Sequence, residues 1–411
     1  MRRYDVIIAG AGHAGSAVAG ELRAAGFTGT ILLVGDEPRL PYQRPPLSKG
    51  WLTASPDPEA LELRPAAFYA QERIDLLLGS RAEKVEPAAN LLRLADGTEL
   101  TWRHLVLATG AGPRVPRLPG VGLDGVHVLR DMDDATLLKA ALESGQRLVV
   151  IGGGWVGLEV AASARARGVR VTVLEARPRL LARTAGPTVA ACLERHHLSR
   201  GVDIRTGAQA ERLFAGPDGR VGAVRLADGS CLDCDAVLLA VGAVPRDALA
   251  RAAGLVCRDG VLVDAQGATD APGVYAVGDV TVRPLAGESF SGRLESIQSA
   301  HEQARRTAAA ICGRPQRPLE TPWFWSEQYE LRIQIAGLPL EAGTSVLRGE
   351  PDGPGFAVFH LRGDRLRAVE AVSAPREFAL GRKLIGEGAR VLASALGDQT
   401  RPLREAVLGH G

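Results

Sequence analysis

Two glycine triplets, each followed about 20 residues later by an acid, are the residues of this sequence whose types and spacing could do chemistry. They are Gly10, Gly12 and Gly15 with Asp36, and Gly152, Gly154 and Gly157 with Glu175. In such a triplet the first glycine permits a tight turn, the second lets the backbone approach a pyrophosphate, and the third lets helix and strand pack closely. The acid accepts hydrogen bonds from ribose hydroxyls. One triplet is weak evidence, but two in the same setting indicate two bound dinucleotides.

The elements around each triplet have the order that such a site requires. Apolar runs at 6–9 and 148–151 precede the glycines, alanine-rich stretches of helical type follow, and second apolar runs end at the acids. This pattern predicts two βαβ units in which the helix N-terminus carries partial positive charge toward the phosphates. The fold class is therefore α/β, with two Rossmann-like dinucleotide-binding domains. From residue 321 the pattern changes to alternating strands followed by a helix, which predicts a separate C-terminal α+β domain.

Three further places could contribute to a site. The stretch 37–49 holds four prolines and ends at Lys49, so a stiff loop could press this lysine against a flat ligand, or leave it as a solvated surface lysine. The strand before Gly278 ends at Asp279, which is either a sugar-binding acid or a turn aspartate. Ser296 is a plausible N-cap for a helix over 296–311.

Composition narrows the class of protein. A net charge of +2 gives no reason to expect a nucleic-acid partner, and no apolar run reaches the ~18 residues of a membrane helix. The start Met-Arg-Arg imitates a secretion signal, but Asp5 argues against cleavage, so we expect a cytoplasmic protein. The five cysteines suit a reducing compartment. Cys231 and Cys234 have CxxC spacing but lack the other half of a zinc site, so we expect no metal.

Taken together, the motifs resemble the FAD-containing pyridine-nucleotide reductases of the glutathione-reductase fold. Within these, the sequences RPPLSK at 44–49, LESI at 294–297 and PWFWSEQY at 322–329 are most similar to oxygenase-coupled NADH:ferredoxin reductases of the putidaredoxin-reductase type. The resemblance implies a discontinuous FAD-binding domain (1–112 and 245–320), an NAD-binding domain (113–244) and a C-terminal domain (321–411). It also implies two cofactors, FAD and NADH.

By the same resemblance, residues of this sequence acquire expected roles. Besides the first glycine triplet, the expected FAD contacts are Ala14, Asp36, Lys49, Ala82, Arg130, Asp279 and Ile297. Lys49 is expected to pair with Glu159 beside the flavin N5 edge, although Glu159 could be an ordinary first-turn helix glutamate. The helix N-terminus at Ser296–Ile297 would stabilise negative charge on reduced flavin. Trp323 and Trp325 are expected to cover the flavin or line the electron exit, unless they are only core aromatics; Trp325 is the preferred catalytic candidate.

The nicotinamide coenzyme is expected at the second triplet, with Glu159, Glu175, Arg183 and Gly242 nearby. Glu175 would repel a 2′-phosphate and so favour NADH. The nearby Arg177, Arg179 and Arg183 could instead bind that phosphate, but the acid occupies the decisive strand end, so we expect NADH.

The stretch from Pro41 to Leu52 lacks the cysteines that disulfide reductases of this fold carry there, which excludes a thiol relay. We therefore expect hydride transfer from NADH to flavin N5, and then single electrons to a [2Fe-2S] ferredoxin that feeds a cytochrome P450 or ring-hydroxylating dioxygenase. A possible basic docking face consists of Arg293, Arg305, Arg306, Arg314 and Arg317, unless these form only a solvated face. The alternatives are an NADH oxidase, a rubredoxin or quinone reductase, or a redox-gated interaction protein resembling apoptosis-inducing factor. The oligomeric state stays open between monomer and homodimer.

Overall fold

The computed structural model describes residues 2–54, 56–144, 147–339 and 343–409. The chain forms two compact units, each made of segments that are distant in sequence. The first comprises Met1–Gln43, Asp57–Gly112 and Ala243–Pro322, and the second comprises Arg44–Pro56, Pro113–Gly242 and Trp323–Gly411. The segment that carries Lys49 thus groups with the second glycine triplet, and so does the C-terminal sheet. The expected domain boundaries differ at this segment, and which coenzyme each domain binds stays a prediction.

The first unit is built on a sheet with the strand order β3-β2-β1-β6-β5-β4, and β18 pairs with β6. These strands are β1 (Arg2–Ala9), β2 (Ile31–Val34), β3 (Ile74–Leu77), β4 (Ala82–Glu86), β5 (Leu91–Leu94), β6 (Glu99–Leu107) and β18 (Val274–Ala276). β1 pairs in parallel with β2 on one side and β6 on the other, so the strand order reverses beside β1. Ligands of open α/β sheets bind at the carboxyl ends of strands at such a reversal.

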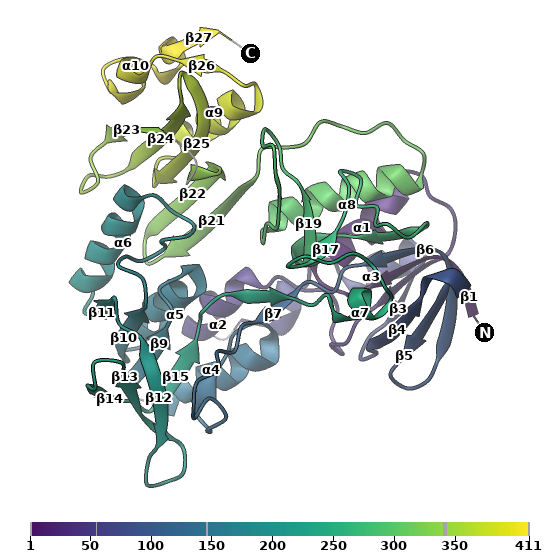
Figure 1. Ribbon diagram of the computed structural model, residues 1–411, viewed down its shortest axis with the longest axis horizontal. Coiled ribbons are helices and arrows are strands. Elements are labelled where there is room, and N and C mark those ends of the chain that lie inside the picture. The colour runs from purple at the N-terminus through teal and green to yellow at the C-terminus, as the bar shows by residue number, and fades with distance from the viewer. Residues whose placement is uncertain (1, 55, 145–146, 340–342, 410–411) are drawn as a thin grey trace. The chain divides into compact units, whose positions relative to one another are not determined.

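Apolar side chains on both faces of this sheet make two cores. Alternation along β1 sends Ile7 into one cluster, and Val6 and Ile8 into the other. In the second cluster α1 packs beside α8 through small residues such as Ala17 and Ala304, which let the helices approach closely (Figure 1). The remaining elements of this unit are α1 (His13–Ala24), η2 (Pro58–Leu61), α3 (Ala66–Gln71), η3 (Pro87–Ala89), β7 (Ala111–Pro113), β16 (Ala243–Pro245), α7 (Ala248–Ala252), β17 (Val261–Leu262), η4 (Gly278–Val280), β19 (Thr281–Pro284), β20 (Ser291–Gly292) and α8 (Ile297–Ile311).

The second unit repeats the nucleotide-binding plan with the strand order β11-β10-β9-β15-β8, and all of these pairings are parallel. A small antiparallel sheet of β12, β13 and β14 is inserted before β15. The elements are η1 (Pro45–Ser48), α2 (Gly50–Thr53), β8 (Val126–His127), α4 (Met132–Ser144), β9 (Arg147–Ile151), α5 (Trp155–Ala166), β10 (Arg170–Glu175), α6 (Pro187–Ser199), β11 (Asp203–Thr206), β12 (Ala210–Ala215), β13 (Val221–Leu226), β14 (Cys231–Asp233) and β15 (Ala236–Leu239).

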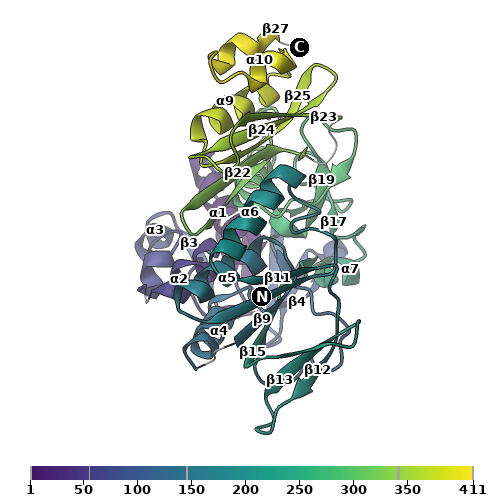
Figure 2. The same ribbon diagram turned by 90° about the vertical axis from the view of Figure 1, so that its left-hand side faces the viewer.

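The C-terminal part of this unit is an antiparallel sheet with the order β21-β22-β25-β24-β23, and α9 packs against it (Figure 2). Phe359 and Val369 share a core with Phe378 of α9. On β25 the fully buried carboxylate of Glu370 accepts a hydrogen bond from the Gly186 N–H at 2.9 Å, where α6 begins. The elements are β21 (Trp323–Gln328), β22 (Leu331–Gly337), β23 (Thr344–Gly349), β24 (Phe356–Arg362), β25 (Arg365–Val372), α9 (Pro375–Gly386), β26 (Arg390–Val391), α10 (Ala393–Gly397), η6 (Leu403–Ala406) and β27 (Val407–Gly409).

Within the described ranges, no helix is long and apolar enough to cross a membrane.

Candidate functional site

The first glycine loop is shaped so that only glycine fits at two of its three positions. Gly10 has φ +124°, and a Cβ there would lie 2.1 Å from the Ala108 carbonyl oxygen. A Cβ on Gly15 would lie 1.9 Å from the Gly10 oxygen. A Cβ on Gly12, in contrast, would meet no described neighbour within 4 Å. Gly12 is the N-cap of α1 and offers no side-chain acceptor to the N–H groups of the first helical turn. This cradle fits a pyrophosphate.

The second loop repeats this geometry. Gly152 has φ +116°, and its Cβ would lie 2.3 Å from the Ala240 oxygen. A Cβ on Gly157 would lie 2.3 Å from the Gly152 oxygen, whereas one on Gly154 would meet nothing within 4 Å in the described chain. Gly154 caps α5 without a side-chain acceptor. Both units therefore place a helix start without a side-chain cap directly after a glycine turn.

The two acids differ in their surroundings. Asp36 lies just beyond β2, its side chain is half exposed, and its nearest cation is Arg246, with Nη1 at 3.4 Å. Glu175 ends β10 and folds back onto its own loop, where it accepts hydrogen bonds from the Gly153 N–H at 2.9 Å and the Arg177 N–H at 2.8 Å. This places the Glu175 carboxylate directly beside the glycine turn, where an adenosine ribose would need an acceptor.

The arginines that follow Glu175 also differ from one another. Arg179 donates to the Leu180 and Ala185 carbonyl oxygens and so braces its own loop. Arg183 is exposed, and its guanidinium lies against Gly242, where an added Cβ would be 3.2 Å from Nη2. The structure therefore brings together Arg183 and Gly242, which were predicted separately for the nicotinamide coenzyme, and occupies Arg179 elsewhere.

In the first unit the Gly-Asp pair at the end of β18 meets the first glycine loop. Gly278 has φ +80°, and a Cβ there would lie 2.8 Å from the Ala14 side chain. Its N–H donates to Gln303 Oε1 at 3.1 Å. The neighbouring Asp279 lies in η4 and is partly exposed. Ala14 and Asp279, which are both predicted FAD contacts, therefore lie on either side of Gly278 at the first glycine loop.

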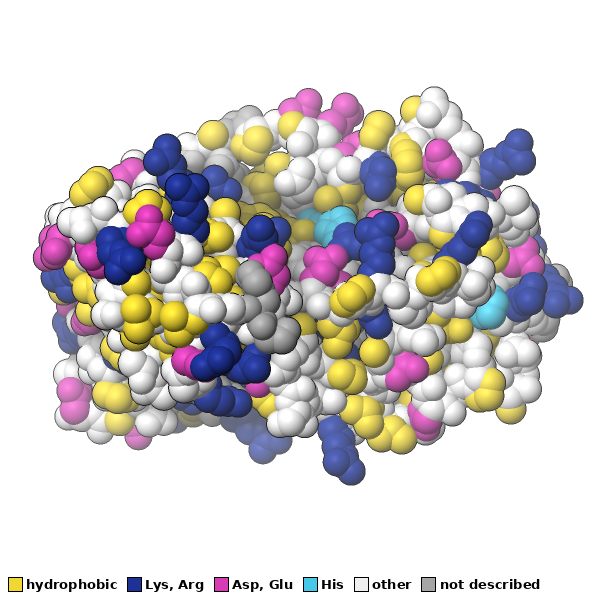
Figure 3. All heavy atoms as spheres, turned by 90° about the horizontal axis from the view of Figure 1, so that it is seen from above, with side chains coloured by type: hydrophobic (Ala, Val, Ile, Leu, Met, Phe, Trp, Pro, Cys, Tyr) yellow, Lys and Arg dark blue, Asp and Glu magenta, His cyan; other side chains and the backbone are white. Residues whose placement is uncertain are grey.

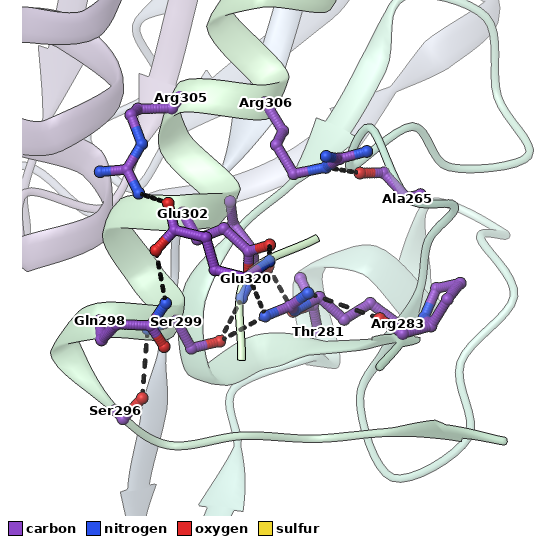
Figure 4. A network of polar contacts seen from close by, with 12 residues as sticks. Ala265, Thr281, Arg283, Ser296, Gln298, Ser299, Glu302, Arg305, Arg306 and Glu320 are labelled. Atoms are coloured by element: carbon purple, nitrogen blue, oxygen red, sulfur yellow. Dashed lines mark hydrogen bonds and ion pairs between the residues drawn. The ribbon is translucent and has the colours of Figure 1, made fainter. Parts of the chain in front are cut away.

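A buried polar network fixes the start of α8, where Ile297 is the first helical residue (Figure 4). Ser296 caps the helix, because its hydroxyl accepts from the Ser299 N–H at 3.1 Å. Arg283 donates to the Ser299 hydroxyl at 3.1 Å and pairs with the buried Glu302 at 2.7 Å. Ser296 is thus the N-cap that the sequence predicted. The N–H groups of the first turn of α8 could donate hydrogen bonds to an anion or to a polarised carbonyl.

In the second unit Lys49 and Glu159 form an ion pair, with Lys49 Nζ 2.8 Å from Glu159 Oε2. Glu159 is 7% exposed. Its carboxylate also accepts from the Ser48 hydroxyl at 2.5 Å and from the Ser326 hydroxyl at 2.6 Å. Three donors from two distant segments thus compensate one buried negative charge, which a buried carboxylate requires.

The remaining predicted residues occupy varied positions. Ala82 begins β4 in the first unit. In the second unit the Arg130 N–H donates to Asp134 Oδ2 at 2.9 Å, and its carbonyl accepts from Arg44 Nη1 at 2.8 Å. Trp325 lies on β21 and is partly exposed, with its ring centroid 5.6 Å from that of Trp323. Their cofactor contacts stay predictions.

Residues 4–304 match the pyridine nucleotide-disulphide oxidoreductase family, and residues 323–407 match the reductase C-terminal family. The chain belongs to the pyridine nucleotide-disulphide oxidoreductases. It is 40% identical to rhodocoxin reductase of Rhodococcus erythropolis, over 99% of this chain and 95% of that protein. The predicted fold class is confirmed, and so is the prediction of an oxidoreductase that uses FAD and a nicotinamide coenzyme.

Two solved structures cover almost the whole of this oxidoreductase chain. One is the covalent putidaredoxin reductase–putidaredoxin complex, with 38% identity, a TM-score of 0.95, and coverage of 99% of this chain and 98% of that chain. The other is the ferredoxin reductase for the CYP199A2 system from Rhodopseudomonas palustris, with 37% identity, a TM-score of 0.95, and coverage of 98% and 99%.

Sequence reasoning did not select Ser48 or Ser326. Both lie inside the stretches that carried the family resemblance, but a serine next to a lysine, or one within a strand, is usually a solvated side chain. Only the folded chain shows that both hydroxyls lie against Glu159. A useful signal would have been that Ser326 lies two residues after Phe324 and two before Gln328 on β21, and therefore on the face opposite Trp323 and Trp325.

Proposed function

We propose that this protein is an NADH-dependent ferredoxin reductase that transfers electrons through FAD to a [2Fe-2S] ferredoxin serving an oxygenase. One observation carries the proposal: a chain of this family, similar to ferredoxin reductases from end to end, has no cysteine before Cys192. The disulfide relay after which the family is named therefore has no sulfur at its place, and electrons must leave the flavin directly.

The residues of this chain have distinct tasks in the proposal. FAD, when bound, supplies the step from a two-electron hydride donor to a one-electron acceptor. The first glycine loop, Asp36 and the start of α8 hold and orient it, and the second loop with Glu175 and Arg183 orients NADH. Lys49 and Glu159 act on the flavin as a fixed pair. Trp325 lies on the strand that also supplies Ser326, and we propose it for the electron exit.

The choice of NADH is supported by the arrangement around Glu175. Its carboxylate lies at the turn that would meet the ribose, and a 2′-phosphate there would be repelled. Arg179 is engaged by its own loop, which leaves fewer free cations to bind that phosphate.

The expected basic docking face is not a single free surface. Arg306 is 9% exposed and donates to the Ala265 carbonyl at 2.5 Å, and Arg293 pairs with Glu295 and with Asp259. Arg306 is therefore too buried to lie on a docking face, and the guanidinium of Arg293 is already paired with two carboxylates. Figure 3 shows Lys and Arg side chains in small groups among acidic and apolar side chains on one face. We propose the exposed Arg314 and Arg317 as the members still suited to an acidic ferredoxin.

The proposal is tested by measuring whether the FAD-loaded protein reduces a ferredoxin with electrons from NADH. The protein reconstituted with FAD is mixed anaerobically with NADH and with candidate [2Fe-2S] ferredoxins, while the iron–sulfur absorbance is followed. Bleaching that depends on this protein and persists after thiol alkylation supports the proposal. Rapid oxygen consumption without ferredoxin reduction would favour an NADH oxidase, and loss of activity on alkylation would refute direct transfer. The cytoplasmic location and the choice between monomer and homodimer stay predictions, which fractionation and light scattering would check.

A further inference from the structure

A run of hydrogen bonds crosses the second unit and ends on Glu159. The Tyr329 hydroxyl lies 3.4 Å from His197 Nδ1, and His197 Nε2 lies 2.8 Å from Gln328 Oε1. Gln328 Nε2 donates to the Ser326 hydroxyl at 3.2 Å, and Ser326 donates to Glu159 Oε1 at 2.6 Å. The run therefore links α6, which carries His197, with β21 and with α5, which carries Glu159.

The direction of the run is set by its buried histidine. His197 is fully buried, and burial lowers the pKa of its ring to about 4, so the ring is neutral near pH 7 and carries a single N–H. Because Gln328 presents its oxygen to Nε2, the proton lies on Nε2, and Nδ1 accepts from Tyr329. The amide of Gln328 then donates to Ser326, whose own proton is left for Glu159. Every donor in the run points toward the carboxylate.

Such alignment has an electrostatic consequence. Hydrogen bonds in series polarise one another, and the effect is strongest where water is excluded. Ser326, Gln328 and His197 are each at most 1% exposed. The last bond, from a hydroxyl to a carboxylate, is charge-assisted and so stronger than a neutral one. It anchors one oxygen of Glu159, which leaves the other in place for Ser48 and Lys49.

We propose that Ser326 is a positioning residue of the reaction: it holds the Glu159 carboxylate in the orientation that fixes Lys49 Nζ. The inference rests on the proposed function, in which Lys49 and Glu159 act on the flavin. It assigns to the C-terminal sheet a part in the chemistry, because β21 delivers the hydroxyl that completes the carboxylate's set of donors. His197 and Gln328 act through Ser326 and not on any substrate.

The experiment is a double-mutant cycle on the FAD-loaded protein. Ser326→Ala and Glu159→Gln are made singly and together, and the rate of flavin reduction by NADH is measured in a single turnover. We expect Ser326→Ala to slow reduction about tenfold, the value of one charge-assisted hydrogen bond. In the Glu159→Gln background the same change should have less than about a twofold effect, because contacting residues are not additive. Thr307→Val is the matched control, since it removes a fully buried hydroxyl that donates to the Gln266 carbonyl in the first unit.

A second readout does not depend on activity. Urea unfolding of the same four FAD-loaded proteins should show the same coupling between Ser326 and Glu159, whereas Thr307→Val and Glu159→Gln should be additive. Ser326→Cys keeps the volume and offers only a weak donor, so it replaces the alanine variant if that one does not fold.

The outcomes separate the inference from the function on which it rests. If Glu159→Gln leaves flavin reduction unchanged, the proposed role of the Lys49–Glu159 pair fails. If Glu159→Gln slows reduction while Ser326→Ala has no effect, or an effect that simply adds to it, the positioning role of Ser326 is overturned.

Discussion

Lys49 Nζ lies 2.8 Å from Glu159 Oε2 within one compact unit, although the two residues come from a proline-rich loop and from the first turns of a distant helix. Proline at the start of η1 stiffens the loop, so the lysine meets its acid without a large loss of chain entropy. The pair joins two segments that the sequence separates.

The first prediction concerns this pair. Lys49→Met leaves the Glu159 carboxylate buried beside fewer donors, so unfolding by urea should require about 3 kcal/mol less free energy. The double variant Lys49→Met/Glu159→Gln should recover most of the loss, because no uncompensated charge remains. Equal stability of the wild-type protein and Lys49→Met would contradict a stabilising ion pair. The conservative Lys49→Arg serves as the control for charge alone.

The second prediction compares alanine substitutions at two glycines where an added Cβ meets no described neighbour with one at a glycine where it would clash. Gly12→Ala and Gly154→Ala add a Cβ that meets no described neighbour within 4 Å, so both proteins should fold normally. The added methyl would occupy the pyrophosphate cradle instead. We expect Gly12→Ala to weaken FAD binding, measured by flavin fluorescence. Gly154→Ala should raise KM for NADH while FAD binding is unchanged. Gly10→Ala should fail to fold, since its Cβ would lie 2.1 Å from a carbonyl oxygen. The assignment of one coenzyme to each glycine loop fails if Gly154→Ala weakens FAD binding as much as it raises the KM for NADH.

The third prediction concerns coenzyme choice. Glu175→Ala removes the acceptor beside the glycine turn, so kcat/KM for NADH should fall about tenfold, as expected for a lost charge-assisted bond to a ribose hydroxyl. In the same variant, Thr206→Arg adds a cation at an exposed position beside the retained Arg177 and Arg183, and this should improve the use of NADPH. Glu211→Ala, which removes an exposed acid paired with Arg225, is the control. An unchanged NADH to NADPH preference would refute the assignment of Glu175.

The fourth prediction concerns pH. Burial, with smaller contributions from His196 and Arg200, lowers the pKa of His197 to about 4, although the hydrogen bond that the ring donates to Gln328 acts in the opposite direction. In the unfolded chain the pKa of the His197 ring is near 6.5, so between pH 6.5 and pH 4 the ring is protonated in the unfolded chain and neutral in the folded one. Stability should therefore fall as the pH drops from about 6.5 toward about 4, by up to roughly 3 kcal/mol. His197→Asn should lose this part of the slope in urea titrations. An identical slope in both proteins would show that His197 is not kept neutral by the fold.

Much of the protein could be read from local sequence. A glycine turn, a helix start and an acid at a strand end are short-range features, so both cradles and the cap at Ser296 followed from spacing alone. The packing of Arg293 and Arg306 could not be read in this way. Their acceptors, Asp259 and the Ala265 carbonyl, come from other segments, and a charged residue on a helix or loop gives no sign of being buried.

The sequence by itself determined that two dinucleotide cradles exist, that each ends in an acid, and that no cysteine lies where a thiol relay would need one. Only the tertiary structure decided that the Lys49 segment groups with the second cradle, that Arg179 braces its own loop, and that Ser48 and Ser326 meet on Glu159. The physical reason is distance along the chain. Turns and caps depend on neighbours within a few residues, whereas a buried carboxylate finds its donors only when distant strands and helices pack around it.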